Sequence, residues 1–182
     1  MKKRILGIDP GSRIAGFGVL EYSAEGDIFH IAHGALDVRS SVSSSARSSG
    51  CTTESDFHQR LYLLGLGFRE VLEKYKPDAV AIENIFLGKN ADSAFKLGHA
   101  RGVITYEMLL KKLLVFEYST RLIKKTVTGS GGAEKEQVQD VLKMLLKISS
   151  FTHLDASDAV AVAYHHAVTE IAKARRHRGL EI

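Results

Sequence analysis

Short apolar runs broken by turn residues predict three strands within the first 38 positions. Residues 4–9 and 14–22 are β-rich runs on either side of the turn "DPGS", and residues 28–38 form a third run. Proline, glycine and serine separate the runs, as they do between the strands of hairpins. The start of the chain therefore predicts an antiparallel meander.

Beyond residue 55 the apolar positions take on a helical period. From Asp56 to Tyr75 they recur every three or four residues, which predicts a helix with one apolar face. A buried strand then ends at Glu83, a helix follows, residues 113–119 form a fifth strand, and two helices complete the chain, the last beginning near Asp155. Strands followed by helix–strand alternation predict an α/β fold, with a mixed five-stranded sheet flanked by helices.

One segment does not fit this pattern. Seven of the ten residues from Ser40 to Ser49 are serine, and such a segment has too little apolar surface to offset the entropy lost on ordering. We expect a mobile loop over about 39–55, inside a single domain that spans residues 1–182. A basic tail is expected from about residue 173.

Composition sets broad limits on function. The chain has 182 residues, 45% of them hydrophobic, with a net charge of +4 and a pI near 9.1. This mild basic bias is compatible with nucleic-acid binding but is weak evidence for it. Cys51 is the only cysteine, which excludes an intrachain disulfide and a zinc site built on several thiolates. With no signal peptide or membrane span in the sequence, we expect a cytoplasmic protein.

Asp9 lies where the first strand is expected to end. Pro10 holds the residue before it in an extended conformation, and Pro10 with Gly11 suits a tight turn. On its own, Asp9 is better explained as a turn-capping residue than as a ligand.

Three further acids have comparable alternatives. Glu83 ends a strand of apolar residues, and an ionised carboxylate at that position either emerges into solvent or meets a cation or hydrogen-bond donors. Asp155 and Asp158 are three residues apart, on one face of a helical turn. Asp155 could be the N-cap of the last helix, with Asp158 in its first turn.

Together the four acids suggest a metal site. They come from three elements that we expect to adjoin, and without a counter-ion such a cluster would raise the pKa of at least one member. All-oxygen ligands favour Mg²⁺ or Mn²⁺ over zinc. Two such ions about 4 Å apart can activate a water and stabilise the leaving oxygen in phosphodiester cleavage.

Four stretches of the sequence closely resemble the bacterial RuvC family of Holliday junction resolvases. They are "ILGIDPGSRIAGFGVLE", "AIENIFLGKNADSAFKLGHARGV", "FEYSTRLIKKTVTGSGGAEKEQVQ" and "LDASDAVAVAYHHA". The resemblance runs from about Arg4 to Ala167 and implies a ribonuclease-H-like fold. The serine-rich segment and the C-terminal tail lie outside what the resemblance explains.

The resemblance implies roles for particular residues. Asp9, Glu83, Asp155 and Asp158 match the four acids that bind two Mg²⁺ ions, which Mn²⁺ can replace. Phe86 matches an aromatic residue that stacks near the junction centre. Two further matches, Lys124 and Lys135, are to lysines that contact DNA near the scissile phosphate, and Lys135 is also expected to act in catalysis.

The resemblance also implies an assembly and a reaction. The expected enzyme is a homodimer that makes paired, symmetric nicks in four-way DNA junctions, leaving 5′-phosphates, during recombination and repair. Its expected partners are the RuvA and RuvB branch-migration proteins.

Two alternatives stay open at this point. "GIDPGS" loosely resembles the phosphate loop of the actin and sugar-kinase folds, although those proteins need a second lobe. A DNA-binding module without catalysis is the other alternative. The basic residues Arg121, Lys124 and Lys125 could also be an ordinary solvated surface. All four acids are present, which argues against a purely binding role.

Overall fold

The computed structural model describes residues 1–39, 53–84 and 90–179, with side chains for residues 53–55 left undescribed. Residues 40–52 of the serine-rich segment, and Phe86, therefore lie outside the described residues. Among the described helices, none is long and apolar enough to cross a membrane.

Five strands form one mixed sheet in the order β3-β2-β1-β4-β5. The first three pair antiparallel, as the meander predicted, whereas β4 pairs parallel to β1, and β5 parallel to β4. The strand bounds are β1 Lys2–Asp9, β2 Ile14–Ser23, β3 Ile28–Asp37, β4 Ala79–Glu83 and β5 Leu114–Tyr118. The predicted α/β class with a mixed five-stranded sheet is confirmed.

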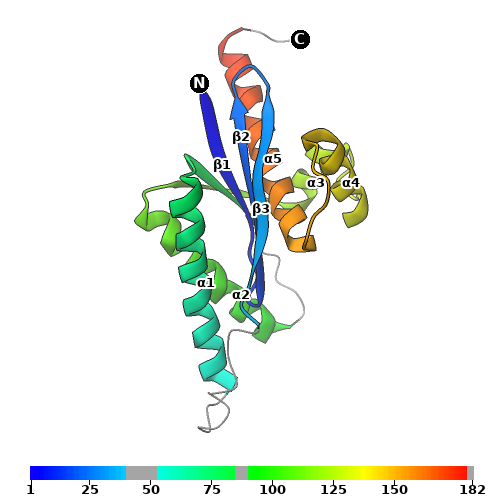
Figure 1. Ribbon diagram of the computed structural model, residues 1–182. Coiled ribbons are helices and arrows are strands. Elements are labelled where there is room, and N and C mark those ends of the chain that lie inside the picture. The colour runs from blue at the N-terminus through cyan, green and yellow to red at the C-terminus, as the bar shows by residue number, and fades with distance from the viewer. Residues whose placement is uncertain (40–52, 85–89, 180–182) are drawn as a thin grey trace.

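Helices cover both faces of the sheet (Figure 1). The helices α1 and α2 lie on one side, and α5 with α3 and α4 on the other (Figure 1). Their bounds are α1 Thr53–Tyr75, α2 Ala91–Leu110, α3 Thr120–Thr128, α4 Lys135–Leu146 and α5 Leu154–His177. The sheet therefore separates two cores.

The core on the α1/α2 side is filled by large side chains. Leu64 and Phe68 of α1 are each 1% exposed and pack with Leu6 and Ile8 of β1. Their spacing is the one from which the helix was predicted. The buried Glu107 of α2 accepts two hydrogen bonds from Arg69 of α1, at 3.0 and 2.8 Å, and this ion pair ties the two helices together.

On the opposite face, small residues bring α5 close to the sheet. A Cβ atom at Gly7 would lie 2.2 Å from the carbonyl oxygen of Ala159, and one at Gly18 would lie 2.6 Å from Val160 Cγ2. Real Cβ atoms do not approach other atoms so closely, so only glycine allows this contact. Gly7 and Gly18 are cross-strand partners, and together they form a flat surface on which α5 lies.

The structure corrects two expectations. The helix α3 was not predicted, because its sequence "TRLIKKTVT" is rich in β-branched residues that disfavour helices. Asp155 is not the N-cap of α5: His153 holds that position, and Asp155 lies in the first helical turn. The basic segment expected from about residue 173 begins inside α5, whose last turns contain Lys173 and Arg175.

Candidate active site

Asp9 and Glu83 lie next to each other at the same edge of the sheet. Asp9 is the last residue of β1, and Glu83 is the last residue of β4. These strands are parallel, and Ile8 pairs with Ile82, so the following residue of each strand is an acid. Parallel strands present their carboxyl ends at one edge, where α/β sheets commonly place ligands.

The start of α5 adds Asp155 and Asp158 to this edge. Asp9 pairs with Gly16 across β1 and β2, and a Cβ at Gly16 would lie 1.9 Å from the carbonyl oxygen of Asp155. The glycine therefore lets the start of α5 lie directly over the sheet beside Asp9. Asp158 follows one turn later, on the same face of the helix.

The four carboxylates affect one another's ionisation. Burial is the main cause that raises the pKa of Asp9 to about 8, the charges of Glu83, Asp158 and Asp155 contribute to the same rise, and the charge of Lys135 opposes it. Burial also raises the pKa of Glu83, against a hydrogen bond from Thr120 that lowers it. A carboxyl group that is held neutral in this way ionises readily only when a cation joins the cluster.

These residues fit divalent metal ions. The donor set consists of carboxylate oxygens, which are the ligands that Mg²⁺ and Mn²⁺ prefer. Within the described ranges, no group of three or more His, Cys, Asp or Glu side chains is placed so that it could hold a metal ion as it stands. Like-charged carboxylates repel one another, so a cation would have to draw these side chains closer together.

The two predicted lysines border the acids. Lys135 is the first residue of α4, after the Gly-rich turn, and its Nζ lies 2.7 Å from Asp158 Oδ2. This contact raises the pKa of Lys135. Lys124, on α3, donates to the carbonyl oxygen of Ala133 at 2.6 Å, and its charge also lowers the pKa of Glu83. Both ammonium groups therefore lie near the carboxylates.

Two residues that the sequence did not single out hold Glu83 in place. The hydroxyl of Thr120 donates a hydrogen bond to Glu83 Oε1. Arg101 donates from Nη1 to the carbonyl oxygen of Glu83 at 2.5 Å, and its Nη2 lies 2.8 Å from Glu117 Oε1. Both contacts join residues far apart in the chain, so no local sequence pattern predicts them. The predicted contact of Phe86 lies outside the described residues.

The adjacent histidines of α5 lie in the core rather than in the acid cluster. His166 is 1% exposed, and its Nδ1 lies 2.9 Å from the hydroxyl of Tyr118. His165 is 8% exposed, with its Nδ1 2.6 Å from the hydroxyl of Thr126. This placement gives both histidines a structural role.

Fold and site together define a class. A sheet in this order, covered by helices on both faces and carrying acids at the ends of two parallel strands, is a ribonuclease-H-like fold with a candidate phosphoryl-transfer site. Solved structures that share the fold include Thermus thermophilus RuvC in complex with a Holliday junction substrate, with a TM-score of 0.78 and 23% identity over 94% of this chain and 97% of that one. They also include the yeast mitochondrial Holliday junction resolvase Ydc2, with a TM-score of 0.63 and 12% identity over 97% of this chain and 84% of that one.

Sequence comparison identifies the family. The family model "Crossover junction endodeoxyribonuclease RuvC" matches residues 5–166. The protein of that name from Bdellovibrio bacteriovorus is 51% identical over 98% of each chain, and that from Geotalea uraniireducens is 43% identical over 92% of this chain and 90% of its own. The chain belongs to the RuvC family of crossover junction endodeoxyribonucleases.

Proposed function

We propose that this chain is a Holliday junction resolvase, a single ribonuclease-H-like nuclease domain that makes paired, symmetric nicks in four-way DNA junctions. The proposal is supported by the position of Asp9, whose pKa is raised by burial and by the charges of Glu83, Asp158 and Asp155, in a chain 51% identical to a named member of the family. A nuclease of this family depends on a divalent metal ion. In the finer form of the proposal, two Mg²⁺ ions serve each subunit, and Mn²⁺ can replace them.

The carboxylates would hold the metal ions. Asp9 and Glu83 contribute from the strand ends, and Asp155 and Asp158 from α5. When bound, the metal ions would activate the attacking water and stabilise the leaving oxygen. The chain itself keeps the carboxylates in position: Gly16 lets α5 approach Asp9, and Thr120 and Arg101 fix Glu83.

The lysines would meet the DNA. The side chain of Lys135 is 59% exposed and paired with Asp158, so it can exchange a carboxylate partner for a phosphate oxygen when the strand arrives. We propose that it neutralises charge that develops on the reacting phosphate. Lys124 is proposed to contact the same strand, and Phe86 to stack near the junction centre, as the family resemblance implies.

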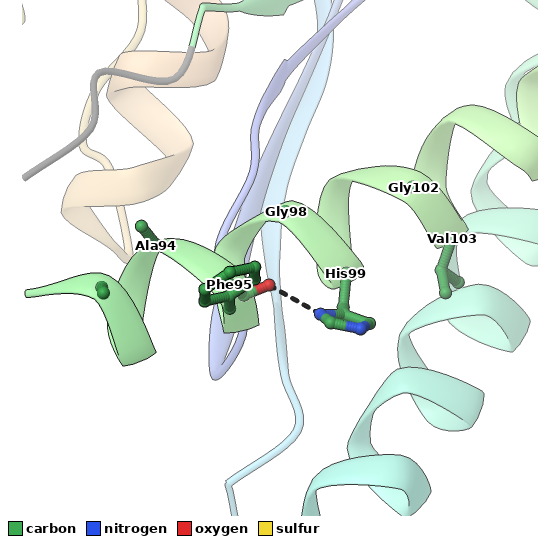
Figure 2. A pocket seen from close by; sticks show the side chains of 7 residues that line it. Ala94, Phe95, Gly98, His99, Gly102 and Val103 are labelled. Atoms are coloured by element: carbon green, nitrogen blue, oxygen red, sulfur yellow. Dashed lines mark hydrogen bonds between the residues drawn. The ribbon is translucent and has the colours of Figure 1, made fainter.

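The proposal includes a homodimer, because paired nicks need two active sites. One face of α2 can carry the contact between subunits (Figure 2). It lines an apolar cavity of about 640 Å³, and a Cβ at Gly98 or Gly102 would meet no atom within 4 Å. Small residues on an apolar helix face allow a second helix to approach closely. RuvA and RuvB are the proposed partners and the cytoplasm the proposed location, since the family processes chromosomal DNA there.

The decisive experiment is the substitution Asp9→Asn. The variant should bind a synthetic four-way junction as tightly as the wild type and should lose nicking in Mg²⁺, since one carboxylate ligand is gone. Gel shift and denaturing gels on junction and linear duplex, with Mg²⁺ or EDTA, measure both properties. Symmetric nicks confined to the junction support the proposal, and retained cleavage by the variant would contradict the metal-site assignment.

A further inference from the structure

A second cavity lies apart from the carboxylates, where the first turns of α1, the N-terminal half of α2 and the β1–β2 turn meet. Its volume is about 870 Å³, and none of the four acids lines it. Figure 1 shows the N-terminal ends of α1 and α2 at the same end of the molecule as the carboxyl end of β1. Its lining contains three cations, two phenylalanines, two histidines and two carboxylates: Arg13, Arg60, Lys96, Phe57, Phe95, His58, His99, Asp56 and Asp92.

The guanidinium of Arg60 is oriented by the aromatic ring of Phe57. Its Cζ lies 5.7 Å from the centroid of the Phe57 ring, which in turn packs edge-on against His99 at 5.8 Å. This cation–π contact orients the guanidinium. Arg60 Nε is buried and has no hydrogen-bond partner in the described part of the chain. Because Nε is buried, a ligand in the cavity would have to meet the Nη groups at the end of the same guanidinium.

Arg13 brings a second cation, on the side nearest the candidate active site. It lies four positions after Asp9 in the chain, and its carbonyl oxygen accepts a hydrogen bond from the backbone N–H of Val38 at 2.9 Å, which fixes the turn. The side chain is exposed, and among the described residues no carboxylate lies within ion-pair distance of it. Its charge is therefore available to an anion.

The other side chains that line the cavity indicate which class of ligand fits it. Asp92 also lines the cavity but is paired with Lys96 at 2.5 Å. Phe95 is 70% exposed, and Figure 2 shows it on the outer side of α2 one turn from His99. Exposed aromatic rings between cationic side chains suit a nucleic-acid strand, whose phosphates meet the cations while its bases or sugars meet the rings. A compact inorganic anion would use only the cations.

We propose that this cavity binds the sugar–phosphate backbone of the DNA strand that leads to the cleavage site. The inference rests on the proposed function and deepens it by assigning DNA contacts outside the carboxylate cluster. Arg13 and Arg60 contact phosphates, and Phe95 packs against a base or sugar. Phe95 and His99 also border the neighbouring apolar face of α2, so the surface left for a second subunit is the rest of that face, which includes Ala94, Gly98, Gly102 and Val103.

The test is the salt dependence of junction binding in EDTA, where no cleavage occurs. Each phosphate contact contributes about −0.9 to the slope of log Kobs against log salt. Full-length Arg13→Gln should therefore bind a four-way junction more weakly, with a slope less steep by about 0.9. The matched control is Lys111→Gln, which removes an exposed cation at the opposite end of α2 and should leave the slope unchanged.

Phe95→Ala provides a second, chemically different measurement. Loss of a stacking contact should weaken junction binding about tenfold with no change in salt slope. Since Phe95 is exposed, the melting temperature should stay that of the wild type. A variant that melts early would be replaced by Phe95→Leu, which keeps the apolar volume and removes the aromatic face, and which should show the same loss of affinity.

The outcomes separate the possibilities. A wild-type slope for Arg13→Gln overturns the inference while leaving the proposed function intact, provided that the wild type nicks junctions in Mg²⁺. Sedimentation of Arg13→Gln as a smaller species than the wild type would also overturn it, because the cavity would then belong to the interface between copies. A wild type that neither binds nor cuts junctions would overturn the proposed function together with the inference.

Discussion

The two faces of the sheet are built on opposite principles. On the α1/α2 side, large side chains such as Phe68 and Leu64 fill the space between helix and sheet. On the α5 side, Gly7, Gly16 and Gly18 remove side chains so that the helix backbone lies almost on the strands. The first arrangement buries more apolar surface per residue, whereas the second fixes backbone positions more closely.

This difference explains why the acids gather on one side. Asp155 and Asp158 can reach the strand ends only if the start of α5 lies within a few ångströms of β1 and β2, and Gly16 permits that approach. The helices α1 and α2 carry the two cavities that we associate with DNA and with a second subunit, and no strand residue lines either cavity. The α5 face therefore carries two of the candidate catalytic acids, and the α1/α2 face carries the proposed binding surfaces.

The largest expected effect comes from substituting one residue on each face. Gly16→Ala places a Cβ against the carbonyl of Asp155 and should displace the start of α5. Because a misplacement of about 1 Å can cost about a hundredfold in rate, junction cleavage should fall by about that factor, with about 1–3 kcal/mol lost in stability. Phe68→Ala should lose about 3–5 kcal/mol of stability, yet cleavage per folded molecule should be retained.

Urea unfolding and single-turnover cleavage measure the two properties separately. The matched control is Gly132→Ala, because a Cβ at this position, close to the candidate site, would meet no atom within 4 Å. It should behave as the wild type in both assays. Equal losses of cleavage from Gly16→Ala and Phe68→Ala, after correction for the folded fraction, would contradict the division between the faces.

The sequence predicted the features that repeat locally. Periodic apolar residues gave the five strands and every helix except α3, whose β-branched residues conceal it. The acids at the ends of the apolar runs were found in the same way, and the parallel register of β1 with β4 places Asp9 and Glu83 side by side as expected. Their role as ligands stays a prediction.

Contacts between distant segments could not be predicted. A glycine in a strand weakens it, and nothing in the sequence around Gly16 shows that its purpose is contact with a helix 139 positions later. Thr120 and Arg101 likewise gain their importance from Glu83, which lies in another element. Such residues become visible only when the fold has brought the segments together.

The second expected effect is a loss of folding stability at acid pH, caused by a histidine on the α5 face of the sheet. Burial lowers the pKa of His166 from 6.5 to about 4, so the unfolded chain binds a proton that the folded chain rejects between these values. The folded state should therefore lose stability as the pH falls from about 6.5 to 4, by about 2–3 kcal/mol. Among the described residues, the only buried histidines are His165 and His166, and both belong to α5.

Urea unfolding of the wild type and of His166→Gln at several pH values measures this effect. Glutamine keeps a hydrogen-bond acceptor for Tyr118 but does not titrate, so the variant should show a flatter dependence below pH 6.5. Parallel curves for the two proteins would show that His166 does not carry the acid sensitivity, and that the faces do not differ in this respect.

The smallest expected effect comes from removing the hydroxyl of Thr120, which connects the start of α3 to Glu83 by a hydrogen bond. Thr120→Val keeps the shape of the side chain but removes the donor, so the Glu83 carboxylate loses one fixed orientation. A hydrogen bond to a charged group contributes about 1.5–3 kcal/mol, and partial replacement by water should reduce the effect to about five- to tenfold. We expect a higher Mn²⁺ concentration for half-maximal thermal stabilisation, together with slower cleavage.

Thr120→Ser restores the donor and should return both measurements to wild-type values, whereas Thr128→Val, which removes a hydroxyl at the other end of α3, should change neither. If Thr120→Val slowed cleavage without altering the Mn²⁺ dependence of stability, Thr120 would act on the DNA and not on Glu83. The precise positions of carboxylates would then depend on the close approach of α5 alone, and α3 would serve only to present Lys124.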